Sequence, residues 1–168
     1  MSTRSTTPST FRHRNLPLLL LQAREAVIAR FRPLLNAQGV TEQQWRIVRS
    51  LLDTGPQEPR QIGRLCGISS PSLAGVLARM EDLDLVSRER LAHDQRRVRV
   101  SLTARSRRLA AALAPRIDAE YAALQARVGP ELLARAYATL DELMRLLGAA
   151  SDAASDAAPD AAPGAFEA

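Results

Sequence analysis

A pair of short β-strand patterns that directly follows two short helical patterns constrains the fold of this chain most. In residues 85–91 and 98–102 apolar side chains alternate with charged ones, and the segment between them is rich in arginine. This alternation predicts two strands joined by a charged tip. The two helical patterns before them, at about 60–66 and 70–82, are separated by Gly67. A helix-turn-helix with a basic hairpin behind it is the order of a winged helix, which is a DNA-binding fold.

Local signals mark where these elements begin and end. Thr41 and Gln44 have the spacing of a capping box, so a helix is expected to start there. Ser70 is expected to cap the second helix of the helix-turn-helix, with Pro71 as its first helical residue. Asp84 stands where the chain turns into the first strand, a position that suits Asp because it tolerates the left-handed conformation.

Long helical patterns flank the winged helix, which is expected over about 41–103. Apolar residues recur at helical spacing over about 13–36, where Pro33 is expected to kink or end the helix, and again over about 103–148. The predicted fold class is mainly α with a small β-wing: a winged helix-turn-helix DNA-binding domain flanked by N- and C-terminal dimerisation helices. A winged-helix core is too small to cover both sets of apolar stripes, so we expect a homodimer. The alternative is an intramolecular bundle.

The two ends of the chain differ in composition from its middle. Residues 1–12 are rich in Ser and Thr, and residues 149–168 repeat Ala and Asp without any basic side chain. Both segments are expected to be disordered, which leaves residues 13–148 as the folded part.

Composition limits the kinds of function. The net charge is +5, and all 23 basic side chains are arginine, which suits bidentate contacts with phosphate and guanine. The single cysteine, Cys66, excludes an internal disulfide and is expected to be a small buried residue rather than a redox sensor. His13 and His93 lie far apart without cysteine neighbours, and no phosphate-loop or nucleophile-elbow motif occurs. We therefore expect a cytoplasmic protein with no membrane span, metal, cofactor or enzymatic activity.

The second helix of the helix-turn-helix and the hairpin tip supply candidate DNA contacts. The start of a helix has free N–H groups that a phosphate can satisfy, and serine hydroxyls there can reach phosphates or base edges. Asp94 is expected to orient one arginine through a carboxylate–guanidinium pair, and Arg96 to enter the minor groove. The predicted DNA-binding residues are Ser69, Ser70, Ser72, Gly75, Arg79, Asp94, Arg96 and Arg97. The alternative is an ordinary capped surface helix followed by a solvated hairpin tip.

The only tryptophan lies where a small ligand is expected. Trp45 is on the helix between the first long helix and the DNA-binding part, and two arginines follow it closely. An aromatic wall with guanidinium groups suits a small aromatic carboxylate. The predicted effector-binding residues are Gln22, Arg24, Trp45, Arg46 and Arg49. Core packing with surface arginines is an equally good interpretation of these residues.

Two other classes of function are weighed against a DNA-binding regulator. An enzyme that acts on aromatic acids would need a general base, a nucleophile, a metal or a cofactor motif, and the sequence contains none of these. A helical protein-interaction module would show no salt-dependent DNA binding, whereas a regulator with arginine–phosphate contacts would show a steep salt dependence.

Several segments of the chain resemble the MarR family of winged-helix regulators. The resemblance covers about residues 16–147, and its hairpin segment is general to the family. Within the family, the chain is similar to the HpaR subgroup, the regulators of homoprotocatechuate degradation. The segments that carry this similarity are LLQAREA (20–26), FRP (31–33), TEQQWRIVR (41–49), PSLAGVLARME (71–81) and VSRERLAHDQRRVRVSLT (86–103).

The resemblance implies a function as well as a fold. It implies a homodimeric repressor of aromatic-compound catabolism genes that binds a palindromic double-stranded DNA operator and is released by a small phenolic or aromatic carboxylate. It also implies that Arg96 enters the minor groove with support from Asp94, and that Arg79 lies near the DNA backbone. Two positions depart from the family pattern: Gly75 follows Ala where many members have Thr-Arg, and Asp84 replaces the usual glycine.

Overall fold

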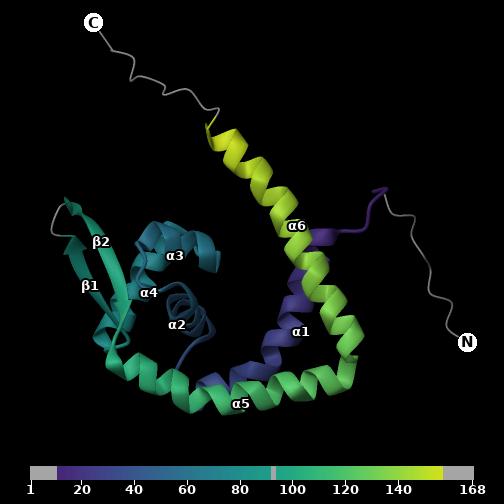
Figure 1. Ribbon diagram of the computed structural model, residues 1–168, viewed down its shortest axis with the longest axis horizontal. Coiled ribbons are helices and arrows are strands. Elements are labelled where there is room, and N and C mark those ends of the chain that lie inside the picture. Colours follow the sequence, from purple (N-terminus) through teal and green to yellow (C-terminus); the bar gives the residue numbers. More distant parts are fainter. Residues whose placement is uncertain (1–10, 92–93, 157–168) are drawn as a thin grey trace, which may run out of the picture. The chain divides into compact units, whose positions relative to one another are not determined.

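The computed structural model describes residues 11–91 and 94–156, with the backbone alone at 91, 95, 96 and 149–156. These residues form two compact units, one up to Glu120 and one from Tyr121 onward. The elements are α1 (Leu16–Asn36), α2 (Glu42–Thr54), α3 (Pro59–Cys66), α4 (Ser70–Asp82), β1 (Val86–Leu91), β2 (Asp94–Leu102), α5 (Ala104–Val128) and α6 (Pro130–Asp156). The predicted fold class is confirmed: helices flank a helix-turn-helix that is followed by a two-stranded antiparallel wing (Figure 1).

The helix-turn-helix closes around one apolar core. Helices α2, α3 and α4 lie together beside the β1–β2 hairpin (Figure 1). Their inward side chains form a single cluster with residues of both strands, and Ile47, Ile62 and Met80 have no exposed surface. The predicted capping box opens α2, because Thr41 Oγ1 accepts from Gln44 N at 3.2 Å and Gln44 Oε1 accepts from Thr41 N at 2.9 Å.

The turn before α4 is fixed by its backbone. Gly67 ends α3 in the left-handed conformation, with φ 59°. The cap of α4 is Ser69 rather than the predicted Ser70, because the first helical bond runs from Leu73 N to Ser69 O at 2.9 Å. Pro71 is therefore the second helical residue, where its missing N–H removes no intrahelical bond.

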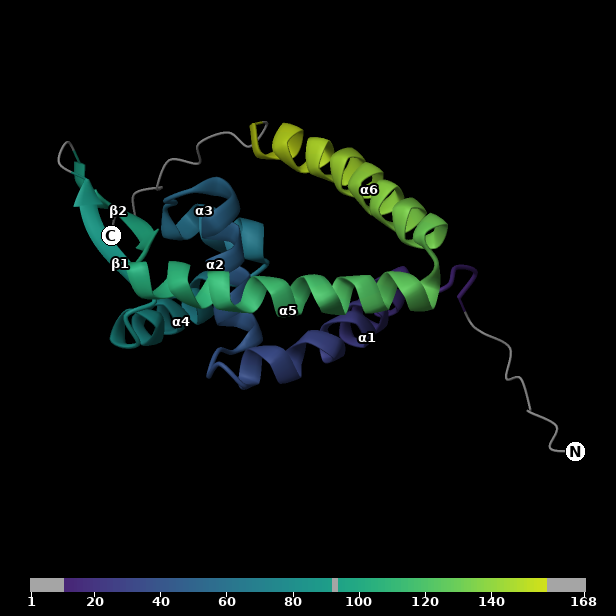
Figure 2. The same ribbon diagram turned by 60° about the horizontal axis from the view of Figure 1, so that its bottom comes forward.

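The wing is a two-stranded hairpin, and Gln57 forms one extra antiparallel pairing with Val100 at its edge. Its register runs from Val86↔Leu102 to Arg90↔Val98, with an irregularity between Arg90 and Leu91. Strand β2 begins at Asp94, four residues before the predicted start at Val98. The prediction was wrong there because backbone pairing continues toward the tip, past the last apolar side chain that alternation could reveal. Figure 2 shows the two strands of the hairpin beside α4.

The connections on either side of the hairpin are tightly bonded. Asp84 has φ 54°, which confirms the predicted left-handed turn. Thr103 Oγ1 caps α5 by accepting from Ser106 N at 3.2 Å, and it donates to Asp84 O at 2.6 Å. The buried Ser106 hydroxyl donates to Leu85 O. Hydrogen bonds therefore join the start of α5 to residues 84–85, directly before β1.

The second half of α1 packs against the first half of α5. Phe31 and Leu35 of α1 form a second core cluster with Leu113 and Ile117 of α5. Helix α1 continues through Pro33 and ends at Asn36, at the predicted bound, so Pro33 does not end it. A proline removes only one backbone bond, and here buried apolar residues on both sides hold the helix in place.

The second unit contains the end of α5 and all of α6. Gly129, with φ 86°, separates the two helices. Helix α6 continues to Asp156, beyond the predicted end of the folded part at residue 148. The added segment is rich in alanine, the strongest helix former, which explains why it continues the helix. The rest of the expected disordered tail, and residues 1–10, lie outside the described residues.

Several large apolar side chains remain exposed on α6 and on α1. They include Leu132, Tyr137, Leu140, Met144, Leu146 and Leu147 of α6, and Leu16, Leu18, Leu20, Leu21 and Val27 of α1. Among the residues that the structure describes, no helix is both long and apolar enough to cross a membrane.

Candidate nucleic-acid interface and ligand pocket

The exposed face of α4 carries the predicted recognition residues. Ser69, Ser70 and Ser72 are exposed at the start of the helix, and Ser69 Oγ donates to Ser72 Oγ at 3.0 Å. Arg79 is exposed one turn beyond Gly75. The three serines and Arg79 are thus exposed and Gly75 is half-buried, with small polar groups at the N-terminal end of the helix.

Gly75 has no steric reason to be a glycine within its own chain. A Cβ built at this position would meet only Arg79 Nη1, at an ordinary contact distance of 3.7 Å. Glycine in a helix interior costs about 1 kcal/mol of stability relative to alanine. The Arg79 guanidinium lies next to the space where a side chain at position 75 would begin.

Two arginines of the wing are bound to glutamates of the helix-turn-helix. Arg88 Nε of β1 donates to Glu81 Oε2 of α4 at 2.8 Å, and Arg97 Nε of β2 donates to Glu58 Oε1 at 2.9 Å. The hydrogen bond from Arg88 lowers the pKa of Glu81, and the same bond raises the pKa of Arg88. The pKa of Arg97 is raised in the same way by Glu58. Both pairs are partly exposed, so each contributes little to stability.

The remaining predicted wing contacts are only partly described. Asp94 and Arg96 lie in β2, but the Arg96 side chain is outside the described part of the structure. A pair between them, and the insertion of Arg96 into the minor groove, therefore stay predictions. Within the described residues, Arg90 and Arg99 are exposed and form no ion pair, which leaves their guanidinium groups available.

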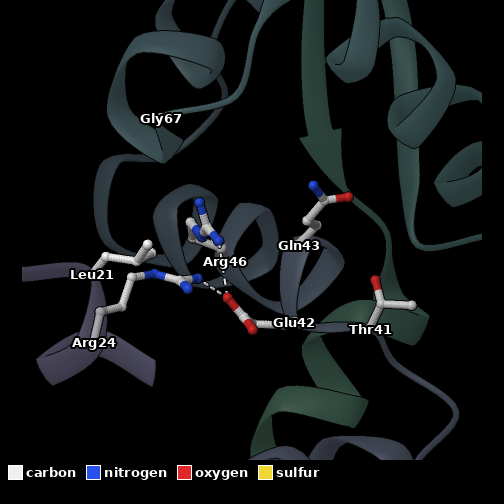
Figure 3. A pocket seen from close by; sticks show the side chains of 7 residues that line it. All are labelled: Leu21, Arg24, Thr41, Glu42, Gln43, Arg46 and Gly67. Carbon is white, nitrogen blue, oxygen red and sulfur yellow. Dashed lines mark hydrogen bonds and ion pairs between the residues drawn. The ribbon is translucent and has the colours of Figure 1, made fainter. Parts of the chain in front are cut away.

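A cavity of about 610 Å³ opens between α1, the start of α2 and the turn after α3 (Figure 3). It is lined by Leu21, Arg24, Thr41, Glu42, Gln43, Arg46 and Gly67. The Arg24 and Arg46 side chains come from different helices and converge on the Glu42 carboxylate (Figure 3).

Glu42 is the centre of a charged cluster beside this cavity. Its carboxylate pairs with Arg24, with Arg32 Nη2 at 3.2 Å and with Arg46 Nη2 at 3.0 Å. Arg32 also binds Glu25 at 2.6 Å, and this hydrogen bond lowers the pKa of Glu25. Three guanidinium groups thus face two carboxylates, which leaves an excess of positive charge at the cavity.

Arg46 also connects the cavity to the turn before α4. Its Nη1 donates to the carbonyl oxygen of Cys66 at 2.6 Å, at the last residue of α3. Cys66 is buried, and this burial raises the pKa of its thiol, which disfavours the reactive thiolate. These surroundings agree with the expected structural role of Cys66.

The structure brings only two of the five predicted effector residues to the cavity. Arg24 and Arg46 line it, whereas Gln22, Trp45 and Arg49 do not. Trp45 packs against both core clusters, and Arg49 pairs with Asp53 at 3.3 Å. Sequence reasoning missed Leu21, Thr41, Glu42, Gln43 and Gly67. The spacing of Glu42 and Arg46, four residues apart on a helix, was a signal for a charged pair that could have found Glu42.

The helix-turn-helix, its exposed recognition helix and its basic wing define a winged-helix DNA-binding protein. A model of the MarR family matches residues 38–97. The transcriptional regulator FarR of Neisseria gonorrhoeae is 35% identical over 139 residues, which are 83% of this chain and 95% of FarR. The homoprotocatechuate degradative operon repressor of Escherichia coli is 36% identical over 134 residues, which are 80% of this chain and 90% of the repressor. This chain belongs to the MarR family of transcriptional regulators.

A solved relative shares the fold and holds a ligand. The crystal structure of NadR in complex with 4-hydroxyphenylacetate has a TM-score of 0.72 and 36% identity, and it covers 82% of this chain and 97% of NadR. The predicted family and the expectation that the chain is a regulator rather than an enzyme are confirmed. The HpaR subgroup stays a prediction, because FarR and the homoprotocatechuate repressor are 35% and 36% identical to this chain.

Proposed function

We propose that this DNA-binding regulator is a homodimeric repressor whose operator is released when a small aromatic or heteroaromatic carboxylate binds the cavity at Arg24 and Arg46. The observation that carries the proposal is the pair of guanidinium groups that converge in a cavity of about 610 Å³, a volume typical of small-molecule sites. Relatives support the same chemistry. NadR binds 4-hydroxyphenylacetate, and another relative represses a homoprotocatechuate degradative operon. The regulated genes would serve aromatic-compound catabolism.

DNA contact is assigned to α4 and the wing. The serines at the start of α4 and Arg79 would contact phosphates and base edges, and Arg96 would enter the minor groove with Asp94 as its support. Arg97 stands apart from these residues because Glu58 already holds its guanidinium group.

The exposed apolar residues of α1 and α6 favour a dimer. A soluble protein rarely leaves many large apolar side chains on its surface unless another chain covers them. A second copy would cover both surfaces and supply a second recognition helix. Two such helices about 34–36 Å apart fit successive major grooves and read a palindromic site.

A ligand in the cavity would act on the position of α4. The acid would pair with Arg46, which also holds the Cys66 carbonyl at the end of α3. A change at Arg46 would therefore reach the turn that leads into the recognition helix. Release follows only if the acid binds more tightly to the arrangement that fits DNA poorly.

The test is fluorescence anisotropy with a labelled DNA fragment from upstream of this protein's gene, with and without 4-hydroxyphenylacetate. The wild type should bind with a steep salt dependence and dissociate when the acid is added. The Arg46→Gln variant should lose most of the response to the acid. The matched control is Arg49→Gln. Arg49 pairs with Asp53 and lies outside the cavity, so this variant should keep the response to the acid.

Each other result overturns part of the proposal. If Arg49→Gln removes the response and Arg46→Gln keeps it, the ligand binds near Trp45 instead of in this cavity. If neither 4-hydroxyphenylacetate nor nicotinate-type acids release the DNA, the chain regulates an unrelated set of genes. If the protein shows no salt-dependent binding to any fragment, a protein-interaction role replaces the DNA role.

A further inference from the structure

The base of the wing is attached to the helix-turn-helix through the segment before α3. Gln57 pairs in both directions with Val100 of β2, with N–O distances of 3.1 and 2.8 Å. Gln57 therefore lies beside β2 as a one-residue third strand. Antiparallel pairing then places Glu58 opposite Arg99 and diagonal to Arg97.

The carboxylate of Glu58 binds the diagonal partner. Arg97 Nε donates to Glu58 Oε1 at 2.9 Å, and Arg97 Nη2 donates to the same oxygen. Glu58 is also the N-cap of α3: its carbonyl accepts from Ile62 N at 3.1 Å, and its N–H donates to Gln61 Oε1 at 3.0 Å. One ion pair therefore joins the wing to the first turn of the first helix of the helix-turn-helix.

This arrangement makes a phosphate contact by Arg97 costly. The Glu58 side chain is 29% exposed and is paired with Arg97. If Arg97 moved to the DNA, this partly buried carboxylate would lose its guanidinium partner, which is unfavourable. It would then face the negative charge of the duplex without a guanidinium between them. Arg90 and Arg99, which form no ion pair among the described residues, can approach phosphates without this cost.

We propose that Glu58 is a positioning residue for DNA binding, and that Arg97 acts by holding the wing on the helix-turn-helix rather than by contacting a phosphate. The inference rests on the proposed role of the wing in DNA contact. The two possible roles of the Glu58 carboxylate predict opposite changes in DNA affinity when it is removed. If Glu58 only restrains a DNA-binding arginine, its removal strengthens binding, and if it positions the wing, its removal weakens binding.

The experiment measures operator affinity of the full chain across a salt series for Glu58→Gln and Arg97→Gln. Glu58→Gln should bind about threefold to tenfold more weakly, although it removes a negative charge from the DNA-binding part. Arg97→Gln should weaken binding to a similar degree while the slope of log K against log salt stays at the wild-type value. A lost phosphate contact would instead lower that slope by about one.

Two further variants separate positioning from general effects. Glu89→Gln removes an exposed carboxylate of β1 that forms no ion pair among the described residues, and it should bind at least as tightly as the wild type. The double variant Glu58→Arg/Arg97→Glu restores the pair in the reverse direction and should bind more tightly than Arg97→Glu alone. Thermal unfolding of each variant checks that the fold is intact.

Three results would overturn the inference while the wild type still binds the operator: tighter binding by Glu58→Gln, a reduced salt slope in Arg97→Gln, or no rescue in the double variant. Failure of the wild type to bind any operator would instead remove the proposed function itself.

Discussion

The exposed face of α4 and the wing, the two surfaces proposed to contact DNA, differ in their chemistry. The α4 face offers small hydroxyl groups, a glycine and one arginine, Arg79, that forms no ion pair in the described part of the chain. The wing carries many arginines, but Arg88 and Arg97 are bound to glutamates of the same molecule. The count of basic residues therefore overstates the charge that the wing can offer to phosphates. The small side chains of α4 allow close approach, whereas part of the wing charge maintains the shape of the wing.

The largest expected effect comes from placing a carboxylate on the α4 face. Gly75→Glu should weaken operator binding by about a hundredfold or more, since a like charge placed against phosphate costs several kcal/mol. The space at Gly75 is open, so the fold should survive. Anisotropy measures the affinity, and circular dichroism measures the helix content.

The matched control at this position is Gly75→Ala, which fills the same space without charge. It should raise stability by about 1 kcal/mol in a denaturant titration. If Gly75→Ala and Gly75→Glu weaken DNA binding equally, shape rather than charge governs the α4 face. If both leave the affinity unchanged, α4 is not the recognition helix.

A smaller effect is expected for the wing arginine that sequence reasoning assigns to the minor groove. Arg96→Ala should weaken binding by about tenfold and lower the salt slope by about one. Arg127→Ala, in the last turn of α5, removes the same charge from a different element and should change neither the affinity nor the salt slope. If Arg96→Ala binds the operator with wild-type affinity, Arg96 does not contact the DNA.

The smallest effect concerns the pair between α4 and β1. Because the hydrogen bond from Arg88 lowers the pKa of Glu81 below its ordinary value of 4.5, the ionised form stabilises the folded state. That stability is present above the unfolded pKa and is lost as the pH falls through the lowered folded pKa. At pH 7 the wild type should therefore unfold at a slightly higher temperature than Glu81→Gln, and the difference should vanish in acid. If the difference in unfolding temperature persists below the lowered pKa of Glu81, it comes from packing and not from charge.

The sequence predicts the order of elements because each has a local signal. The capping box at Thr41 and the left-handed turn at Asp84 both depend on residues only a few positions apart. The start of β2 and the partner of Arg97 lack such a signal. Glu58 lies 39 residues from Arg97 along the chain, and only the pairing of Gln57 with Val100 brings them together.

The candidate pocket was predicted in part for a similar reason. The sequence places Trp45 beside two arginines, but helical spacing does not say which face each presents. The structure directs Arg46 toward the cavity and Trp45 toward the two cores. The contribution of α1 at Arg24 depends on how α1 lies against α2, which no local pattern encodes.

The Glu42 cluster has a consequence for how salt acts on the regulator. Arg24 and Arg46 both pair with the Glu42 carboxylate, so the proposed acid would exchange one carboxylate for another. An exchange leaves the number of ion pairs nearly constant and so releases few bound ions. Operator binding, in contrast, expels the counterions of the duplex. The two anionic ligands proposed for this protein would therefore respond unequally to the same rise in ionic strength: binding of the operator would weaken steeply, and binding of the acid would change little.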